Sequence, residues 1–316
     1  MAVNCIRFER DGIVQWGVVN AGQITPIPGE FPTTKSFIEA HPDPAALRAL
    51  DGPAIAEADI TLLPPVTRDA RFVCQGANYR QHMIESGMNP DDKTFNMIFT
   101  KATSCIAPAN TDVIRPAHVR LLDYEVELGI IMKQAITGPV EVTREALGDY
   151  IAALTIVNDV SARDIQVPQM QFYKGKSFRT FGPVGPYLAL LEPGDAALID
   201  GLDLSLAVNG ETRQSDNTAN LVFKPAETLT ELSGVQDFAI GDLIATGTPA
   251  GCALSVPPPR VQKLAALLPE RKKWEIFNKA QTKRPYLQPG DVMETTIKSP
   301  DGRIDLGVQT NRIVAG

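Results

Sequence analysis

The stretch Asp123-Tyr124-Glu125-Val126-Glu127-Leu128-Gly129-Ile130-Ile131 places two glutamates inside a run that otherwise predicts a buried strand. Side chains at positions i and i+2 of a strand point to the same face, so we expect Glu125 and Glu127 to lie side by side. Two carboxylates on a half-buried face repel each other and lose hydration unless a cation or a proton neutralises them. The stretch therefore predicts a strand whose two acids need a partner.

A third acid occurs in a similar apolar context, because Asp159 follows the run Leu154-Thr155-Ile156-Val157-Asn158. Oxygen ligands suit hard cations, so the three acids predict a site for Mg²⁺, Mn²⁺ or Ca²⁺. The alternative is that the two glutamates line a solvated sheet face while Asp159 caps a helix. The pattern of acids by itself leaves both interpretations open.

Composition excludes several classes of protein. The chain has 316 residues, 44% of them hydrophobic and 21% charged, and its net charge of −7 comes without any basic run. Binding to nucleic acid or to an anionic membrane surface is therefore disfavoured. The sequence contains neither a secretory signal pattern nor the run of about 20 apolar residues that spans a bilayer. Four scattered cysteines without CxxC spacing predict reduced thiols, and together these features predict a cytoplasmic protein.

The first 66 residues are expected to form a small N-terminal module. Asp11-Gly12 separates two apolar-alternating runs, which predicts a β-hairpin. A short helix is expected over Thr34–Ala40, and Leu62–Val66 is expected to be an extended linker. Residues 67–316 would then form the main domain.

In the main domain, strand-like runs alternate with glycine and proline rather than with long helices. Strands are predicted at 203–208, 243–246 and 292–297, and helices at 79–86, at 143–150 with Thr143 as N-cap, at 226–233 and within 261–282. This pattern favours a β-rich α+β fold over a doubly wound parallel sheet. The stretch from Pro257 to Gln288 is expected to be an amphipathic helical excursion between two strands.

Several short motifs occur in an order that resembles the fumarylacetoacetate hydrolase family, from about Leu62 to the C-terminus. They are Gly76-Ala77-Asn78-Tyr79-Arg80-Gln81-His82-Met83-Ile84-Glu85, Phe99-Thr100-Lys101, Asp123–Leu128, Asn158–Gln166, Gly175-Lys176-Ser177-Phe178, Val208-Asn209-Gly210-Glu211, Gly241-Asp242, Thr246-Gly247-Thr248-Pro249-Ala250-Gly251 and Pro289-Gly290-Asp291. The resemblance implies a mixed β-roll core, a homodimer and a divalent metal, Mg²⁺ or Mn²⁺ with Ca²⁺ as a further candidate, on Glu125, Glu127 and Asp159.

His82 and Glu85 lie three residues apart in the helix predicted at 79–86, so their side chains can meet. A glutamate bonded to an imidazole fixes its tautomer and makes it a better base. The alternative is a surface pair worth a few tenths of a kcal/mol. The resemblance favours the first interpretation and implies that His82 is a catalytic base oriented by Glu85.

The resemblance assigns further roles. Lys176 matches the family's active-site lysine, and an ammonium near the cation would stabilise an oxyanion or enolate. Arg163 and Gln166 match positions that contact substrate; Arg163 would suit a carboxylate, although Asp164 could equally hold it in a structural pair. The turn at Thr248 lacks the Walker lysine of a phosphate loop, and its hydroxyl or a backbone amide is expected to contact substrate oxygen instead.

Together these features predict a metal-dependent hydrolase that cleaves a C–C bond in a 1,3-dicarbonyl acid, such as an acylpyruvate or a fumarylacetoacetate-like acid, as in aromatic catabolism. The same site could instead decarboxylate an oxaloacetate-type 2-oxo acid, or hydrate or isomerise a 2-oxo acid. A metal-stabilised binding protein without turnover is the alternative from another class. The small-molecule acid and a second copy of the chain are the expected partners.

Overall fold

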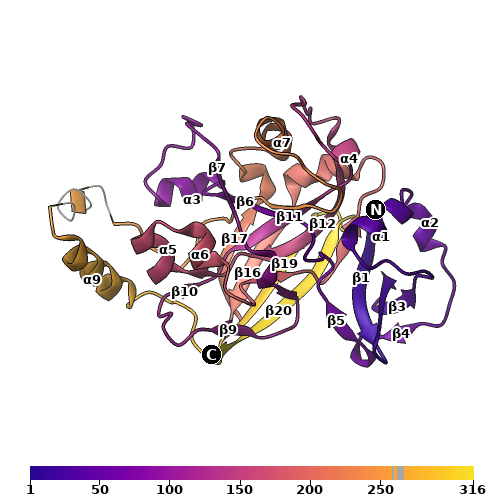
Figure 1. Ribbon diagram of the computed structural model, residues 1–316, viewed down its shortest axis with the longest axis horizontal. Helices are drawn as coiled ribbons and strands as arrows, with labels where there is room; N and C mark the ends of the chain where they lie inside the picture. Colours follow the sequence, from indigo (N-terminus) through magenta and orange to yellow (C-terminus); the bar gives the residue numbers. More distant parts are fainter. Residues whose placement is uncertain (258–259, 262–266) are drawn as a thin grey trace.

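Two neighbouring strands at the centre of the fold, β11 (Val126–Met132) and β12 (Ile151–Asn158), are buried along their entire length. Their near-continuous apolar sequence is typical of strands covered on both faces. They pair antiparallel, with Val126 opposite Asn158. The computed structural model describes residues 1–257, 260–261 and 267–316 of this strand-rich α+β protein (Figure 1).

The largest sheet contains these two strands. Along its main path the order is β4 (Ile55–Ala56), β3 (Gln23–Pro26), β2 (Ile13–Asn20), β1 (Val3–Arg10), β15 (Leu188–Leu190), β12, β11, β18 (Leu243–Ala245), β6 (Phe72–Gly76) and β7 (Met97–Thr100). Beside this path, β14 (Gly182–Val184) pairs with β12 and β8 (Ile106–Pro108), and β5 (Thr61–Leu63) pairs with β1.

A second sheet packs against β11 and β12. It consists of β17 (Glu211–Asn217), β16 (Asp203–Val208), β19 (Val292–Lys298), β20 (Asp305–Ala315) and β9 (Val113–Arg115). Buried and more exposed residues alternate along β19 and β20, as expected for strands with one face on the core. Strands β10 (Leu122–Asp123) and β13 (Ser161–Ala162) pair as a short antiparallel ribbon. Along the chain, β10 comes just before β11 and β13 comes just after β12. The predicted strands at 203–208, 243–246 and 292–297 are confirmed.

The helices of the described residues are short. They are α1 (Thr34–Ala40), α2 (Ala45–Arg48), α3 (Arg80–Glu85), α4 (Leu147–Tyr150), α5 (Arg163–Gln169), α6 (Phe172–Lys176), α7 (Pro225–Ser233) and α9 (Glu270–Gln281), with 3₁₀ turns at 57–59, 103–105, 195–201 and 218–220. The helix predicted at 143–150 is wrong in its first half. Thr143 closes a turn by accepting from the Ala146 N–H, and α4 begins only at Leu147.

The N-terminal residues extend the large sheet. The predicted hairpin is confirmed, since Asp11 and Gly12 have φ of 53° and 78° between β1 and β2. Strand β1 pairs on to β15, with Val3 opposite Leu190. The expected linker is partly wrong, because Thr61–Leu63 forms β5 against β1. The boundary at residue 66 stays a prediction.

The excursion between β18 and β19 carries α9, which projects from the molecule at the end opposite the N-terminal strands (Figure 1). Its base is clamped: the Ser255 N–H donates to Gln281 Oε1 at 3.2 Å, and Gln281 Nε2 donates back to the Ser255 carbonyl at 2.7 Å. Tyr286 Oη also donates to Gln281 Oε1 at 2.9 Å. The rest of the predicted helical piece includes residues 262–266, which lie outside the described residues.

Candidate active site

The register of β11 and β12 brings the three predicted acids together. Glu125 immediately precedes β11 and Asp159 immediately follows β12, and the Asp159 N–H donates to the Glu125 carbonyl at 2.8 Å. One carboxylate oxygen from each of Glu125, Glu127 and Asp159 lies within 4.8 Å of the others. The three residues are only 5%, 1% and 0% exposed. The alternative of a solvated sheet face is therefore wrong.

Two lysines neutralise the acids from the side of β7 and α6. Lys101 Nζ donates to Asp159 Oδ1 at 2.5 Å and to the Phe181 carbonyl at 2.7 Å. Lys176 Nζ donates to Glu125 Oε2 at 2.5 Å, to Asp159 Oδ2 at 2.6 Å and to Ser161 Oγ at 2.8 Å. Lys101 is not among the site residues predicted from sequence, although it lies in one of the motifs that carry the resemblance.

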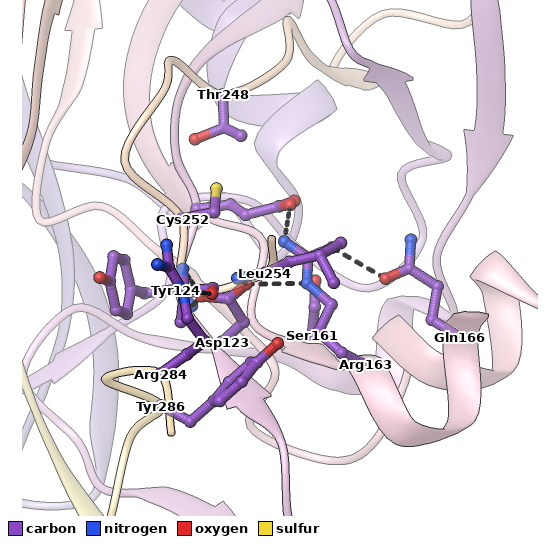
Figure 2. Close-up of polar contacts among 12 residues, drawn as sticks. Asp123, Tyr124, Ser161, Arg163, Gln166, Thr248, Cys252, Leu254, Arg284 and Tyr286 are labelled. Carbon is purple, nitrogen blue, oxygen red and sulfur yellow. Dashed lines mark hydrogen bonds and ion pairs between the residues drawn. The ribbon is translucent and has the colours of Figure 1, made fainter. Parts of the chain in front are cut away.

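A third cation, Arg163 at the start of α5, lies between two acids (Figure 2). Its Nε donates to Asp123 Oδ2 at 2.9 Å, its Nη1 donates to Gln166 Oε1 at 2.8 Å, and its Nη2 pairs with Glu125. The alternative of a structural pair between Arg163 and Asp164 is not seen in the described residues, where Asp164 accepts the Arg120 N–H. The partner of Arg163 is Asp123, two residues before Glu125 in the same alternating series.

Asp123 is a fully buried hub that joins Arg163 to the base of the excursion. Its Oδ1 accepts the N–H groups of Tyr124 and Ala253 at 3.0 and 2.8 Å, and its Oδ2 accepts that of Leu254 at 3.0 Å. Figure 2 shows Leu254, Arg284 and Tyr286 gathered around this carboxylate. The excursion is thereby bonded to the residues that hold Glu125.

Glu127 differs from the other acids because its only hydrogen-bond partner among the described residues is a backbone N–H, that of Gly247 at 2.9 Å. Gly247 has φ of +91°, and a Cβ there would lie 2.8 Å from Asn78 Cβ, so the turn that presents this N–H requires glycine. Burial and the neighbouring carboxylates of Asp159 and Glu125 raise the pKa of Glu127 well above its usual range.

Glu125 is held in its charged form. Burial acts to raise its pKa, but Arg163 and Lys176 outweigh burial and lower the pKa to about 2. Burial likewise acts to lower the pKa of Lys176, yet Asp159 and Glu125 outweigh it, so the pKa of the ammonium is raised. Glu125 and Lys176 are thus an ion pair at neutral pH.

A cavity of about 410 Å³ opens above the acids, and all of the predicted site residues except Asp159 line it. His82 is half-buried in its wall, and burial lowers the pKa of the imidazole. The expected hydrogen bond from His82 to Glu85 is not formed in the described residues. Glu85 is exposed in the last turn of α3 and accepts from Gln81 Nε2 at 3.4 Å instead.

Thr248 and Gln166 present polar atoms to the same cavity. Thr248 Oγ1 accepts from Gln214 Nε2 at 2.8 Å, which fixes the turn after β18. The carboxamide oxygen of Gln166 is taken up by Arg163, while its Nε2 has no hydrogen-bond partner among the described residues. Gln166 therefore has a donor that is free to meet a ligand oxygen.

The donor set fits a hard divalent cation. Asp123, Glu125, Glu127 and Asp159 bring four buried carboxyl groups against three buried cations, so one carboxyl group has no positive partner. That group is Glu127, and its Oε1 has no hydrogen-bond partner among the described residues. Carboxylate oxygens are the ligands that Mg²⁺ and Mn²⁺ prefer, so the cluster can bind a divalent cation.

The chain is similar to known proteins over most of its length. The family model of the fumarylacetoacetate hydrolase C-terminal domain matches residues 71–314. Oxaloacetate tautomerase YisK of Bacillus subtilis is 34% identical over 210 residues, which cover 64% of this chain and 66% of the relative. A mitochondrial oxaloacetate tautomerase of Bos taurus is 35% identical over 209 residues, covering 66% and 64%. The chain thus spans about two thirds of the length of these relatives.

Similarity to a solved structure extends over the full fold. The fumarylacetoacetate hydrolase of Exiguobacterium antarcticum superposes with a TM-score of 0.76 at 29% identity, covering 99% of this chain and 100% of that one. The strand-rich α+β prediction is confirmed by this likeness. Because the likeness covers nearly all of both chains, it includes the N-terminal strands as well as the region around the acids.

Proposed function

The chain belongs to the fumarylacetoacetate hydrolase family, and from this premise we propose that it is a divalent-metal-dependent hydrolase of 1,3-dicarbonyl acids. The substrate would be an acylpyruvate or a fumarylacetoacetate-like acid, cleaved at the C–C bond between its two carbonyl groups. The observation that carries the proposal is the convergence of His82, Lys176 and the acids Glu125 and Glu127 on one cavity.

Glu125, Glu127 and Asp159 would hold the cation, Mg²⁺ or Mn²⁺, which when bound supplies Lewis acidity to the 2-oxo acid end of the substrate. Lys176 and Arg163 keep Glu125 ionised and oriented for this task. Lys101 and Lys176 hold the Asp159 carboxylate in place through ion pairs. Lys101, Arg163 and Lys176 thus act by fixing the acids. A contact of Lys176 with a substrate oxyanion would replace one of the three bonds that its ammonium makes to protein oxygens.

His82 would act as general base because its lowered pKa keeps the imidazole neutral near pH 7. It takes a proton from water, and the oxygen bonds to the distal carbonyl carbon. When the C–C bond breaks, its electron pair moves to the carbon next to the 2-oxo group. That carbon takes the proton back from His82, which yields a carboxylic acid and a 2-oxo acid. Gln166 Nε2 and the Thr248 turn would hold substrate oxygens.

A second candidate is oxaloacetate chemistry, favoured by the two relatives named as oxaloacetate tautomerases. In this reading no water attacks, and His82 only moves a proton between carbon and the enol oxygen. Decarboxylation of oxaloacetate and hydration or isomerisation of other 2-oxo acids use the same polar end of the cavity. A binding protein without turnover is the remaining alternative.

The test is turnover of acetylpyruvate, fumarylpyruvate, fumarylacetoacetate and oxaloacetate with Mg²⁺ or Mn²⁺. We expect the diketo acids to be consumed by the wild type, with activity lost on adding EDTA and reduced about 100-fold or more in His82→Ala. His118→Ala is the matched control, because His118 is exposed and outside the cavity. Turnover of oxaloacetate alone would contradict the hydrolase, and no turnover at all would favour the binding protein.

We also propose a homodimer and a cytoplasmic location. In the described residues no helix has the length and apolar character needed to cross a membrane. Light scattering after size exclusion tests the dimer, and a mass equal to one chain at micromolar concentration would contradict it.

A further inference from the structure

The outer part of the cavity has an apolar wall built from four segments of the chain. Met97 and Phe99 come from β7, Met88 follows α3, Phe172 begins α6, and Leu254 and Val256 come from the base of the excursion. These six residues, called the apolar wall below, are only partly exposed.

The apolar wall begins directly beside the acids. Lys176 Nζ lies 5.2 Å from the centre of the Phe99 ring, and that ring lies 5.3 Å from the ring of Phe172. The cavity therefore has a polar end at Glu125 and Glu127 and an apolar end formed by rings and aliphatic chains. A ligand whose acid end lies at the carboxylates places its other end against the apolar wall.

The cavity offers no spare cation for a second carboxylate. Lys176 donates to three protein oxygens, which matches the three hydrogens of an ammonium. The single positive charge of Arg163 is already paired with two acids, Asp123 and Glu125, and three of its five N–H groups donate to protein acceptors. No other lysine or arginine of the described residues lines the cavity, whereas Glu85 adds negative charge to its rim.

From this arrangement we propose that the substrate carries an uncharged, apolar group beyond its distal carbonyl. A distal carboxylate would lose water against the apolar wall without gaining a partner, which is unfavourable. The inference rests on the proposed function for the identity of the reacting end. It narrows the substrate class to acylpyruvates with an aliphatic or aromatic acyl group, and it disfavours diacids long enough to reach the apolar wall.

The test compares two acylpyruvates of equal length, isocaproylpyruvate and succinylpyruvate, which end in an isopropyl group and in a carboxylate. With the Mg²⁺-loaded protein we expect kcat/KM to be about tenfold or more higher for the isopropyl compound. Calorimetric dissociation constants in His82→Ala, where turnover is removed, should show the same order. Equal or reversed preference in these constants would overturn the apolar inference.

A cation introduced into the apolar wall should change the preference. Met88→Lys is expected to improve kcat/KM for succinylpyruvate, because it supplies a positive partner for the distal carboxylate. The ratio of kcat/KM for isocaproylpyruvate to that for succinylpyruvate should decrease by about tenfold. Ile84→Lys is the matched control, since Ile84 is half exposed on α3, the helix that Met88 follows, but does not line the cavity. An unchanged ratio in Met88→Lys would count against the inference. Tight binding of isocaproylpyruvate without turnover would refute the hydrolase while supporting the apolar preference.

Discussion

The acids of the cluster differ in whether they have a positively charged partner, and this difference decides their protonation behaviour. Asp159 has Lys101 and Lys176, and Glu125 has Lys176 and Arg163, whereas Glu127 has only the Gly247 N–H. Buried carboxylates without a positive partner take up a proton, since burial disfavours the charged form. Glu127 is therefore the residue whose charge state should respond to a cation.

We predict that Mn²⁺ binding releases a proton from Glu127. The pKa of Glu127 in the metal-free protein is raised, so the affinity for Mn²⁺ should increase as the pH rises towards that pKa and level off above it. Calorimetric titrations in buffers of different ionisation enthalpy measure the released proton. In Glu127→Gln the proton release should vanish, and the affinity for Mn²⁺ should fall by about 100-fold. This is the size of effect found when residues at metal sites of other proteins are replaced.

Glu85→Gln is the control for this titration, because Glu85 lines the same cavity but is exposed and is not one of the clustered acids. Its affinity and proton release should match the wild type. A pH-independent affinity in the wild type would contradict the raised pKa of Glu127.

We predict that the pH dependence of kcat/KM has an acidic limb below pH 6.5. Burial lowers the pKa of His82 from its ordinary value of 6.5, so the base form is lost only as the pH falls through this lowered value. A cation on the neighbouring acids shifts the pKa in the same direction. The profile of kcat/KM against pH reports the free enzyme. A limb centred above pH 6.5 would exclude His82 as the base with this pKa.

Single residues were predictable from sequence where local chemistry singled them out. The spacing of Glu125 and Glu127 on one strand and the apolar context of Asp159 predicted the cluster. The partners were not predictable: Asp123 lies 40 residues from Arg163, and Lys101 lies 58 residues from Asp159, so both pairs depend on the three-dimensional fold. Glu85 is the opposite case, a contact that sequence predicted and the structure lacks. Its helical spacing allows a contact with His82, but the exposed Glu85 side chain accepts from Gln81 instead.

The excursion and the strand β11 are linked by one carboxylate. Asp123 at the end of β10 accepts from the backbone of Ala253 and Leu254 and from Arg163, which in turn pairs with Glu125. A substitution at Asp123 should therefore disturb both the base of the excursion and the position of Glu125.

We predict that Asp123→Asn destabilises the fold by about 3–5 kcal/mol, because it removes one partner of a buried ion pair and leaves Arg163 undercompensated. Urea unfolding followed by fluorescence measures this loss, and kcat/KM should fall as well. Asp164→Asn is the matched control, since within the described part of the chain the Asp164 carboxylate accepts only from the backbone of Arg120. Wild-type stability in Asp123→Asn would contradict the role of Asp123 as a hub.

Strands and turns were predictable where apolar alternation or turn chemistry was strong, as at Asp11-Gly12 and along β16 and β19. Helix limits were less so: Thr143 is a good capping residue, but here it closes a single turn before α4. The pairing of β1 with β15 joins strands that are far apart in sequence, and no local pattern indicates such a pair.

The N-terminal residues are integrated into the molecule. Val3, Cys5, Trp16 and Phe37 belong to the main hydrophobic core, and the Trp16 and Phe37 rings stack at 4.0 Å. Because β1 covers one edge of β15, its removal would leave that edge unpaired, while the other edge stays paired with β12.

We predict that a chain limited to residues 67–316 is aggregated or unfolded. It would lose the buried apolar surface of Trp16 and its neighbours and would expose the edge of β15. Circular dichroism and size exclusion of the truncated chain, with and without a separately produced 1–66 fragment, measure the effect. A monodisperse, cooperatively folding 67–316 chain would instead establish residue 66 as a true domain boundary.

The clamp between Ser255 and Gln281 bears on how the excursion can vary in length. The chain leaves the body of the protein and returns to it through these two residues, and Tyr286 reinforces the return. Changes in length between Val256 and Gln281 are therefore expected to leave the acids in their positions. In protein engineering, the same hydrogen-bonded base marks the excursion as an insertion site. A reporter or a second binding unit can be inserted there without changing the residues around the acids.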